Sequence, residues 1–143
     1  MKRASKVLLT VGAIYSLVIS IVFVLCMITF IVLSLPFFAD VIRQGIESGE
    51  ITTNMESVDA AIIFVQAMYI TSAVVFGILA IFGFINSSFA FKGAKEQSRK
   101  LLILNIVFGF LSCVEINAVG GILGLVALSI WGNKEKNAIE NKE

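Results

Sequence analysis

The sequence predicts an all-α integral membrane protein, built as a four-transmembrane-helix up-and-down bundle with a long first hairpin and a short second one. Hydrophobic residues make up 58% of the 143 residues, and the mean hydropathy is +0.97. Soluble domains contain about 45–50% apolar residues, so a soluble fold of this length could not cover so much apolar surface. Uncharged runs at 7–39 and 60–91, and a third at 101–132 that contains only Glu115, provide the expected spans.

Ten of the eleven Lys and Arg residues lie in three clusters that flank these runs. The clusters are Lys2, Arg3 and Lys6, then Lys92, Lys95, Arg99 and Lys100, and finally Lys134, Lys136 and Lys142. Positive residues beside membrane spans stay on the cytoplasmic side. We therefore expect a multi-pass protein of the plasma membrane with both termini and an inner loop, 91–100, in the cytoplasm.

The first span is expected at 7–35, because a helix needs about 20 apolar residues to cross the hydrocarbon core. The Lys-Arg start resembles a secretory signal. However, the uncharged run is much longer than the signal-peptide core of about 7–15 residues, and no small-x-small cleavage site precedes Pro36. We interpret this segment as an uncleaved anchor.

The segment 36–59 is the only sizeable part expected outside, and its pattern predicts a short amphipathic helix on the outer membrane surface. Pro36 suits a first helical turn, and Gly49 suits the position just past a helix end. Arg43 and Glu47 form an i,i+4 pair opposite the apolar face. That apolar face contains Phe37, Phe38, Val41, Ile42 and Ile46. The alternative is that this segment simply extends the first span.

The second span is expected at 60–85, with its helix beginning before the membrane because Thr53 and Glu56 have the spacing of a capping box. The third uncharged run is long for one crossing and short for two. A turn-like segment from Glu115 to Gly121 favours two spans, at 98–114 and 118–131. A single long helix is the alternative, but it would place the basic tail 132–143 outside. The whole chain, 1–143, is then one membrane domain.

Small residues at helical spacing predict sites where helices pack closely in lipid. They are Gly12, Ser16 and Ser20 on the first span, Ala73 and Gly77 on the second, Gly109 on the third, and Gly120 and Gly124 on the fourth. Packing within one bundle is the first interpretation. Contact between copies in a homo-oligomer, through Gly120 and Gly124, is the alternative.

Three polar residues in or beside the expected spans are candidates for a role: Gln66 in the second span, Asn105 in the third and Glu115 near the outer turn. We expect interhelical hydrogen bonds for the two amides. Glu115 is expected as a solvated residue of the outer turn, or, if it folds inward, as the best candidate for a functional carboxylate. Cys26 and Cys113 lie in apolar runs and are expected as free thiols, although a disulfide remains open.

Enzymatic functions are not supported. The sequence has no His, no Gly-rich phosphate loop, no nucleophile elbow and no metal-ligand cluster. It also lacks a carboxylate in the first span, on which the four-span small multidrug exporters depend. The net charge of +1 gives no reason to expect nucleic acid binding. We expect no cofactor.

The string Asn117-Ala-Val-Gly-Gly-Ile-Leu-Gly-Leu-Val-Ala-Leu128, with Trp131, the Lys-rich tail and the start Lys6-Val-Leu-Leu-Thr-Val-Gly12, resembles a group of small bacterial membrane proteins. These four-span proteins form an uncharacterised, domain-of-unknown-function family with a variable outer segment after the first span. The resemblance covers most of the chain in layout. It implies a four-helix membrane fold and no known activity.

The sequence thus favours a non-enzymatic accessory, partner-binding or immunity-type subunit that binds another membrane or extracytoplasmic protein through its outer segment. The expected contact face contains Phe37, Phe38, Val41, Ile42, Arg43, Ile46 and Glu47. The alternative is a small oligomeric transporter or channel, whose path between protomers would be lined by Gln66, Asn105 and Glu115. The basic inner loop would contact anionic lipid or a cytoplasmic protein.

Overall fold

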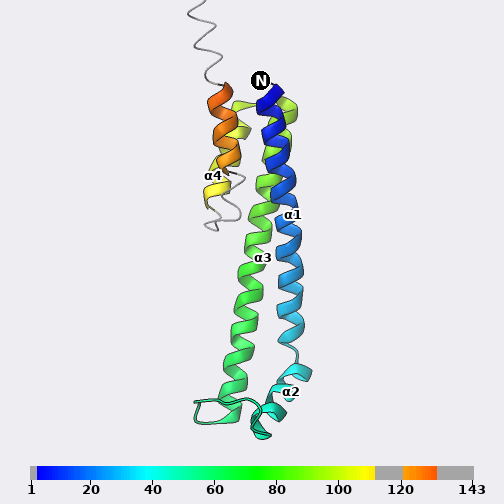
Figure 1. The fold of residues 1–143 in the computed structure, drawn as a ribbon, viewed down its shortest axis with the longest axis vertical. Helices are drawn as coiled ribbons and strands as arrows, with labels where there is room; N and C mark the ends of the chain where they lie inside the picture. Colours follow the sequence, from blue (N-terminus) through cyan, green and yellow to red (C-terminus); the bar gives the residue numbers. More distant parts are fainter. Residues whose placement is uncertain (1–2, 112–120, 132–143) are drawn as a thin grey trace, which may run out of the picture. The chain divides into compact units, whose positions relative to one another are not determined.

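The computed structural model describes residues 3–111 and 121–131, and all regular structure in them is helical (Figure 1). The helices are α1 (Arg3–Leu33), α2 (Pro36–Glu47), α3 (Val58–Glu96) and α4 (Arg99–Leu111), followed by a fifth helix, Gly121–Trp131. The prediction of an all-α fold is therefore confirmed for these residues. The expected outer turn around Glu115 and the tail 132–143 lie outside the described residues.

Two helices, α1 and α3, are long and apolar enough to cross a membrane. They contain 31 and 39 residues, which at about 1.5 Å per residue exceed the hydrocarbon thickness of about 30 Å. Helix α4, with 13 residues, falls short of that thickness, and Gly121–Trp131 is shorter still. In the described part of the chain, two helices rather than the expected four reach crossing length.

The predicted inner loop at 91–100 is largely helical, which corrects the sequence-based boundary. Helix α3 continues to Glu96, and only Gln97 and Ser98 separate it from α4. The helix continues because Gly93 and Ala94 are buried and lie on its packed side. It ends at Gln97, whose φ of 52° is the left-handed conformation that closes many helices.

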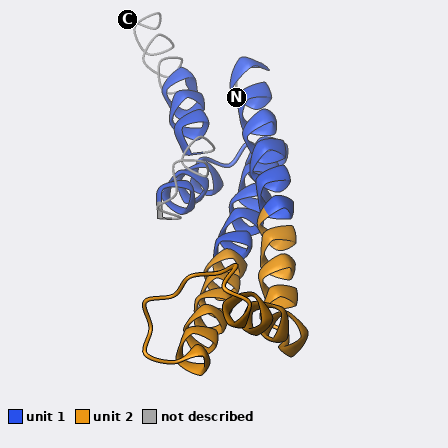
Figure 2. Ribbon diagram, turned by 60° about the horizontal axis from the view of Figure 1, so that its bottom comes forward, with its two compact units in different colours: residues 1–22, 79–143 blue, residues 23–78 orange. Residues whose placement is uncertain are grey.

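The chain divides into two compact units, coloured separately in Figure 2. Unit 1 contains residues 1–22 and 79–143, and unit 2 contains residues 23–78. Helices α1 and α3 contribute to both. The core of unit 1 takes one residue from each of its four helical segments, namely Leu9, Ala94, Leu102 and Ala127, with Leu8, Ile106, Leu128 and Trp131 packed around it. Four helical segments therefore pack together in unit 1.

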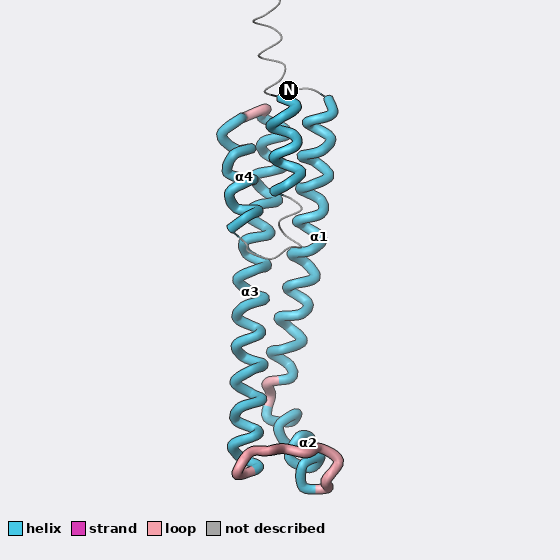
Figure 3. The backbone as a smooth tube through the Cα atoms, turned by 60° about the vertical axis from the view of Figure 1, so that its left-hand side comes forward, coloured by secondary structure: helices cyan, strands magenta, loops and turns pink. Residues whose placement is uncertain are grey.

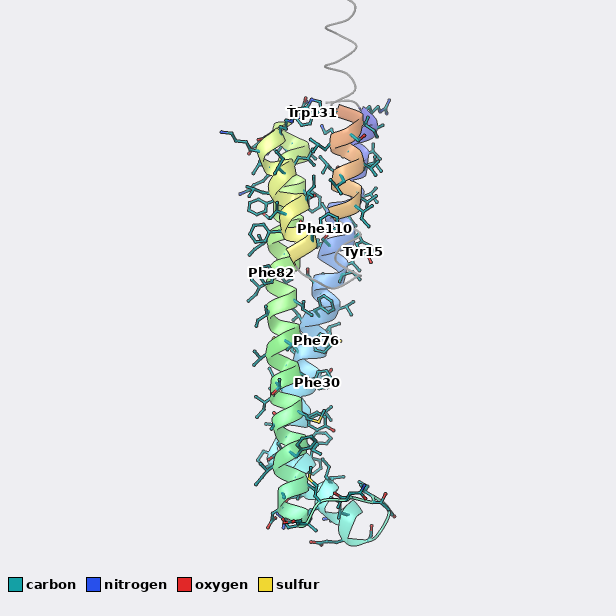
Figure 4. The ribbon with its side chains drawn as sticks, turned by 90° about the vertical axis from the view of Figure 1, so that its left-hand side faces the viewer. Tyr15, Phe30, Phe76, Phe82, Phe110 and Trp131 are labelled. Atoms are coloured by element: carbon teal, nitrogen blue, oxygen red, sulfur yellow. The ribbon has the colours of Figure 1, made fainter. Side chains whose placement is uncertain are left out.

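Unit 2 is held largely by aromatic contacts between the end of α1 and the first half of α3. Figure 4 shows Phe30 and Phe76 on neighbouring helices, with ring centroids 5.5 Å apart and nearly parallel planes. Phe23 approaches Phe76 at 5.8 Å, and Phe30 approaches Tyr69 at 6.1 Å. Rings at such separations contribute about 0.5–1.5 kcal/mol per pair beyond their buried area, so this cluster holds the two helices together here.

Helix α2 is separate from α1, which confirms a distinct short helix over an extension of the first span. Leu35 is extended, with φ −68° and ψ 150°, and Pro36 occupies the first helical turn. The proline ring excludes the helical conformation at the preceding residue, so the break is encoded at this point. The pink loop segments in Figure 3 mark this break and the longer connection from α2 to α3.

The predicted capping box is wrong, because α3 begins only at Val58. Ser57 is the residue that caps it: its Oγ accepts a hydrogen bond of 3.1 Å from the Ala60 amide. Thr53 Oγ1 instead accepts from the Met55 amide at 3.2 Å, within the loop. The Thr53 hydroxyl therefore stabilises a loop turn and not the start of a helix.

Candidate functional site

The segment that follows α2 folds back onto it. The Ser48 amide donates to Gln44 O at 2.9 Å, and the Ile51 amide donates to Gly45 O at 2.9 Å. Between them, Gly49 takes φ +78°, a conformation that glycine adopts without steric cost at helix ends. The Ile51 side chain then covers Gly45 so closely that an added Cβ would lie 2.6 Å from Ile51 Cδ1. Loop and helix form one local unit.

An ion pair connects α2 to the start of α3. Arg43 Nη2 lies 2.7 Å from Asp59 Oδ1, and the two side chains are 46% and 71% exposed. The expected partner, Glu47, is not the one observed, because Asp59 in the first turn of α3 lies within reach of the guanidinium. Pairs this exposed contribute about 0–1 kcal/mol. The contact therefore matters mainly for holding α2 against α3.

The predicted apolar face of α2 is only partly free. Phe37 is 70% exposed and Val41 is 50% exposed, whereas Phe38, Ile42 and Ile46 are half-buried against the rest of unit 2. Residues four apart lie on one side of a helix, so Phe37 and Val41 form a narrow apolar flank. We call these two residues the α2 flank.

Acidic side chains adjoin this flank. Asp40 and Glu47, both exposed, lie seven residues apart and hence on one side of α2, next to the apolar flank. Between α2 and the following loop lies a groove of about 400 Å³, lined by Val41, Gln44, Gly45, Ser48, Glu50 and Ile51. The groove combines an apolar floor with a carboxylate, Glu50. This surface can hold a partner side chain but offers no arrangement for acid–base chemistry.

A second feature, a buried polar network, lies in unit 1. Asn105 Nδ2 in α4 donates to Asn86 Oδ1 at 2.6 Å and to Asn86 O at 3.2 Å. Asn86 Nδ2 in α3 donates to Ser16 Oγ in α1 at 3.3 Å, and Ser20 Oγ donates to Ser16 O at 2.6 Å. All four side chains are buried. In apolar surroundings these hydrogen bonds join three helices, α1, α3 and α4, and fix where along their lengths they pack.

Two further serines extend this network at other levels of the same unit. Ser87 Oγ donates to Ala13 O at 2.8 Å, and Ser5 Oγ donates to Ala127 O at 2.9 Å. Each hydroxyl therefore bonds to the main chain of a neighbouring helix. Sequence reasoning missed Asn86 and Ser87. The signal available was Asn86-Ser87-Ser88, the most polar triplet of the uncharged run 60–91.

Asn105 Oδ1 has no hydrogen-bond donor within the described residues. It lies against Gly124 of the fifth helix, where an added Cβ would come within 2.7 Å of it. A Cα hydrogen of Gly124 occupies that direction, and Cα–H···O contacts of this kind provide weak stabilisation between helices. Glycine is needed here because a side chain would overlap the Asn105 amide.

The predicted packing residues are placed in both units. In unit 1, Gly12, Ser16, Ser20, Gly109 and Gly124 are buried; in unit 2, Ala73 is buried and Gly77 is half-buried. Gly109 packs closely against Gly121, since a Cβ on Gly109 would lie 2.8 Å from the Gly121 backbone. Gly83, which the sequence analysis passed over, touches Ser20 in the same manner. Gly120 lies outside the described residues.

The remaining candidates belong to different units or lie outside the described residues. Gln66, in unit 2, donates from Nε2 to Ser34 O at 3.4 Å, whereas Asn105 belongs to unit 1. Glu115 and Cys113 lie outside the described residues, and Cys26 is a half-buried free cysteine. Residues 3–111 and 121–131 contain no group of three His, Cys, Asp or Glu side chains placed to hold a metal ion.

No protein-family model, curated protein or solved structure was found to match this chain.

Proposed function

We propose that this chain is a four-span protein of the plasma membrane that acts as a non-enzymatic accessory or partner-binding subunit through residues 36–59. The observation that carries the proposal is the outer segment: a short helix that contacts the start of α3 through the exposed Arg43–Asp59 pair, with the α2 flank left exposed. Exposed aromatic and aliphatic residues on a fixed helix are typical of contact surfaces.

The lipid setting is supported by the surfaces of both long helices. Ile63 is 66% exposed and Ile81 is 60% exposed, and large apolar side chains are exposed along α1 as well. A soluble monomer would not leave so many large apolar side chains in water. Hydrocarbon accepts them, while the buried Asn and Ser side chains hydrogen-bond to one another and to backbone carbonyls within unit 1.

The orientation follows from the charges. Arg3, Lys6, Lys92, Lys95, Arg99 and Lys100 are all exposed in unit 1. The segment 36–59 of unit 2 has five carboxylates against one guanidinium, a formal charge of −4. The positive-inside bias then places the basic ends in the cytoplasm and 36–59 outside. Helices α1 and α3 each cross the membrane once, and the two shorter helices provide the other two crossings.

The transporter alternative required Asn105 to line a path between protomers. Asn105 is 2% exposed, and its amide nitrogen is bonded to Asn86 inside the same chain. Asn105 therefore does not support a path between copies. The alternative also involves Gln66 and Glu115, so it stays the second proposal, and we put the partner-binding function first.

Two experiments test the proposal. Reporters fused before Met1 and after Glu143 should both report the cytoplasm. Reporters on opposite faces of the membrane would contradict the proposed topology. Charge reversal within 44–56 should abolish capture of the native partner from cells while membrane insertion stays normal. Normal capture by such a variant would refute a partner-binding role for this segment.

A further inference from the structure

The groove beside α2 has a composition that selects among partners. Val41, Gly45 and Ile51 give it apolar lining, and Gln44, Ser48 and Glu50 give it polar lining with one carboxylate. The α2 flank continues the apolar surface along the helix, since Phe37 and Val41 are four residues apart. A side chain that enters this groove thus meets both apolar groups and a carboxylate.

The charge beside the groove is uncompensated. Arg43 is the only cation between 36 and 59, and it is paired with Asp59. Asp40, Glu47 and Glu50 are exposed, and no ion pair to them occurs among the described residues. An apolar strip beside an acidic strip is the complement of a helix with Leu or Phe on one face and Lys or Arg beside it.

We propose that the groove and the α2 flank bind a cationic amphipathic segment of a partner protein, an inference that rests on the function proposed above. The partner's apolar residues lie on Phe37, Val41 and Ile51. Its Lys or Arg side chains lie beside Asp40, Glu47 and Glu50. Anionic lipid head groups are disfavoured as the occupant, because their phosphates and the carboxylates of Asp40, Glu47 and Glu50 carry charge of the same sign and repel each other.

The binding test uses the full chain in nanodiscs of phosphatidylcholine and a fluorescent helical peptide of Leu and Lys, with a Leu and Glu peptide as its counterpart. The Leu–Lys peptide should bind above the level of empty nanodiscs, more weakly as salt rises, and the Leu–Glu peptide should not bind. Equal binding to empty nanodiscs, or equal binding of both peptides, overturns the inference.

Variants locate the site. The triple change Asp40→Asn, Glu47→Gln and Glu50→Gln should raise the Kd by about tenfold, since exposed charge pairs each contribute a few tenths to one kcal/mol. Glu50→Gln should weaken binding more than Glu56→Gln, because Glu56 lies in the same segment but does not line the groove. Equal effects of these two single variants would show diffuse attraction and contradict a groove.

Lipid as the occupant is tested directly with Phe37→Trp. Tryptophan emission that brominated lipid quenches would place the flank in the bilayer and overturn the inference; emission that the Leu–Lys peptide shifts, without such quenching, supports it. In cells, a photo-cross-linking residue at position 37 should capture a protein through a basic segment. Capture through an acidic or neutral segment would overturn this inference and leave the proposed function intact.

Discussion

Asn105 Nδ2 and Asn86 Oδ1 are 2.6 Å apart, and this bond joins α4 to α3 in the interior of unit 1. The same Asn86 reaches Ser16 of α1 through its other amide atom. One asparagine thus connects three helices. In lipid, where apolar burial gives helices little reason to choose one neighbour over another, such bonds fix the register of the bundle.

Removing either amide should destabilise the bundle, and the two losses should not add. We expect Asn86→Ala and Asn105→Ala each to lower the free energy of unfolding by about 1–2 kcal/mol, since each leaves a buried polar partner unsatisfied. The double variant should fall short of the sum by about 0.5–1.5 kcal/mol. Unfolding by sodium dodecyl sulfate in mixed micelles, followed by circular dichroism, measures all three.

The control for this cycle is Thr29→Val. Thr29 Oγ1 is exposed and bonds only to Leu25 O of its own helix, so its loss should change stability by a few tenths of a kcal/mol at most. Strict additivity of the two asparagine variants would show that the bond between them contributes nothing.

A second prediction concerns the contact between Gly124 and Asn105. Because a Cβ on Gly124 would lie 2.7 Å from Asn105 Oδ1 and 3.0 Å from Ile106 Cγ1, Gly124→Ala should cost about 1–3 kcal/mol through overpacking. The cost should shrink in an Asn105→Ala background, where the nearest obstacle is gone. The same micelle titration measures both variants.

Gly93→Ala is the matched control for Gly124→Ala. Its nearest contacts are at 3.6 Å, an ordinary packing distance. A helical Gly replaced by Ala without a clash gains about 0.5–1 kcal/mol, so this variant should be neutral to stabilising. If Gly124→Ala proves equally harmless, the close approach of the fifth helix to α4 is wrong.

The helical class could be predicted from the sequence because it follows from local chemistry. Long uncharged apolar runs are typical of helices that cross a membrane, where the backbone must form its hydrogen bonds within the segment. The break before α2 was also local, since Pro36 restricts Leu35. The first span, expected at 7–35, is close to α1 (Arg3–Leu33). The second, expected at 60–85, begins near the start of α3 (Val58–Glu96) but ends 11 residues before the end of that helix.

The errors involve partners distant in sequence. Glu47 was assigned to Arg43 by helical spacing, but the observed partner, Asp59, is 16 residues away and becomes available only when α2 folds toward α3. The sequence does not single out Asn86, because its hydrogen bonds depend on which helix faces Asn105. The charges at 91–100 predict a loop that begins before α3 ends, because charged residues mark the end of a membrane span and not the end of a helix. A local sequence pattern therefore predicts neither which residues pair with Arg43 and Asn105 nor where α3 ends.

A third prediction tests the end of α2. Gly49 has φ +78° and no neighbour within 4 Å of an added Cβ, so Gly49→Ala meets only backbone strain, of about 1 kcal/mol. The amides of Ser48 and Ile51 should then exchange hydrogen about fivefold faster. Gly49→Asn should have a smaller effect, since Asn tolerates the left-handed conformation better. If the amides of Ser48 and Ile51 exchange as slowly in both variants as in the unchanged protein, this turn does not close the helix.

The last prediction concerns Arg43 and Asp59, whose contact is geometrically good but exposed to solvent. Their double-mutant cycle should yield a coupling of less than about 1 kcal/mol that declines as salt rises. Arg43→Lys should retain most of it, because a single Nη2–Oδ1 contact at 2.7 Å needs one donor and not a planar fork. Arg43→Ala should leave insertion and global stability unchanged but accelerate hydrogen exchange in α2. A coupling above about 2 kcal/mol would require a desolvated pair and would contradict the exposure of both side chains.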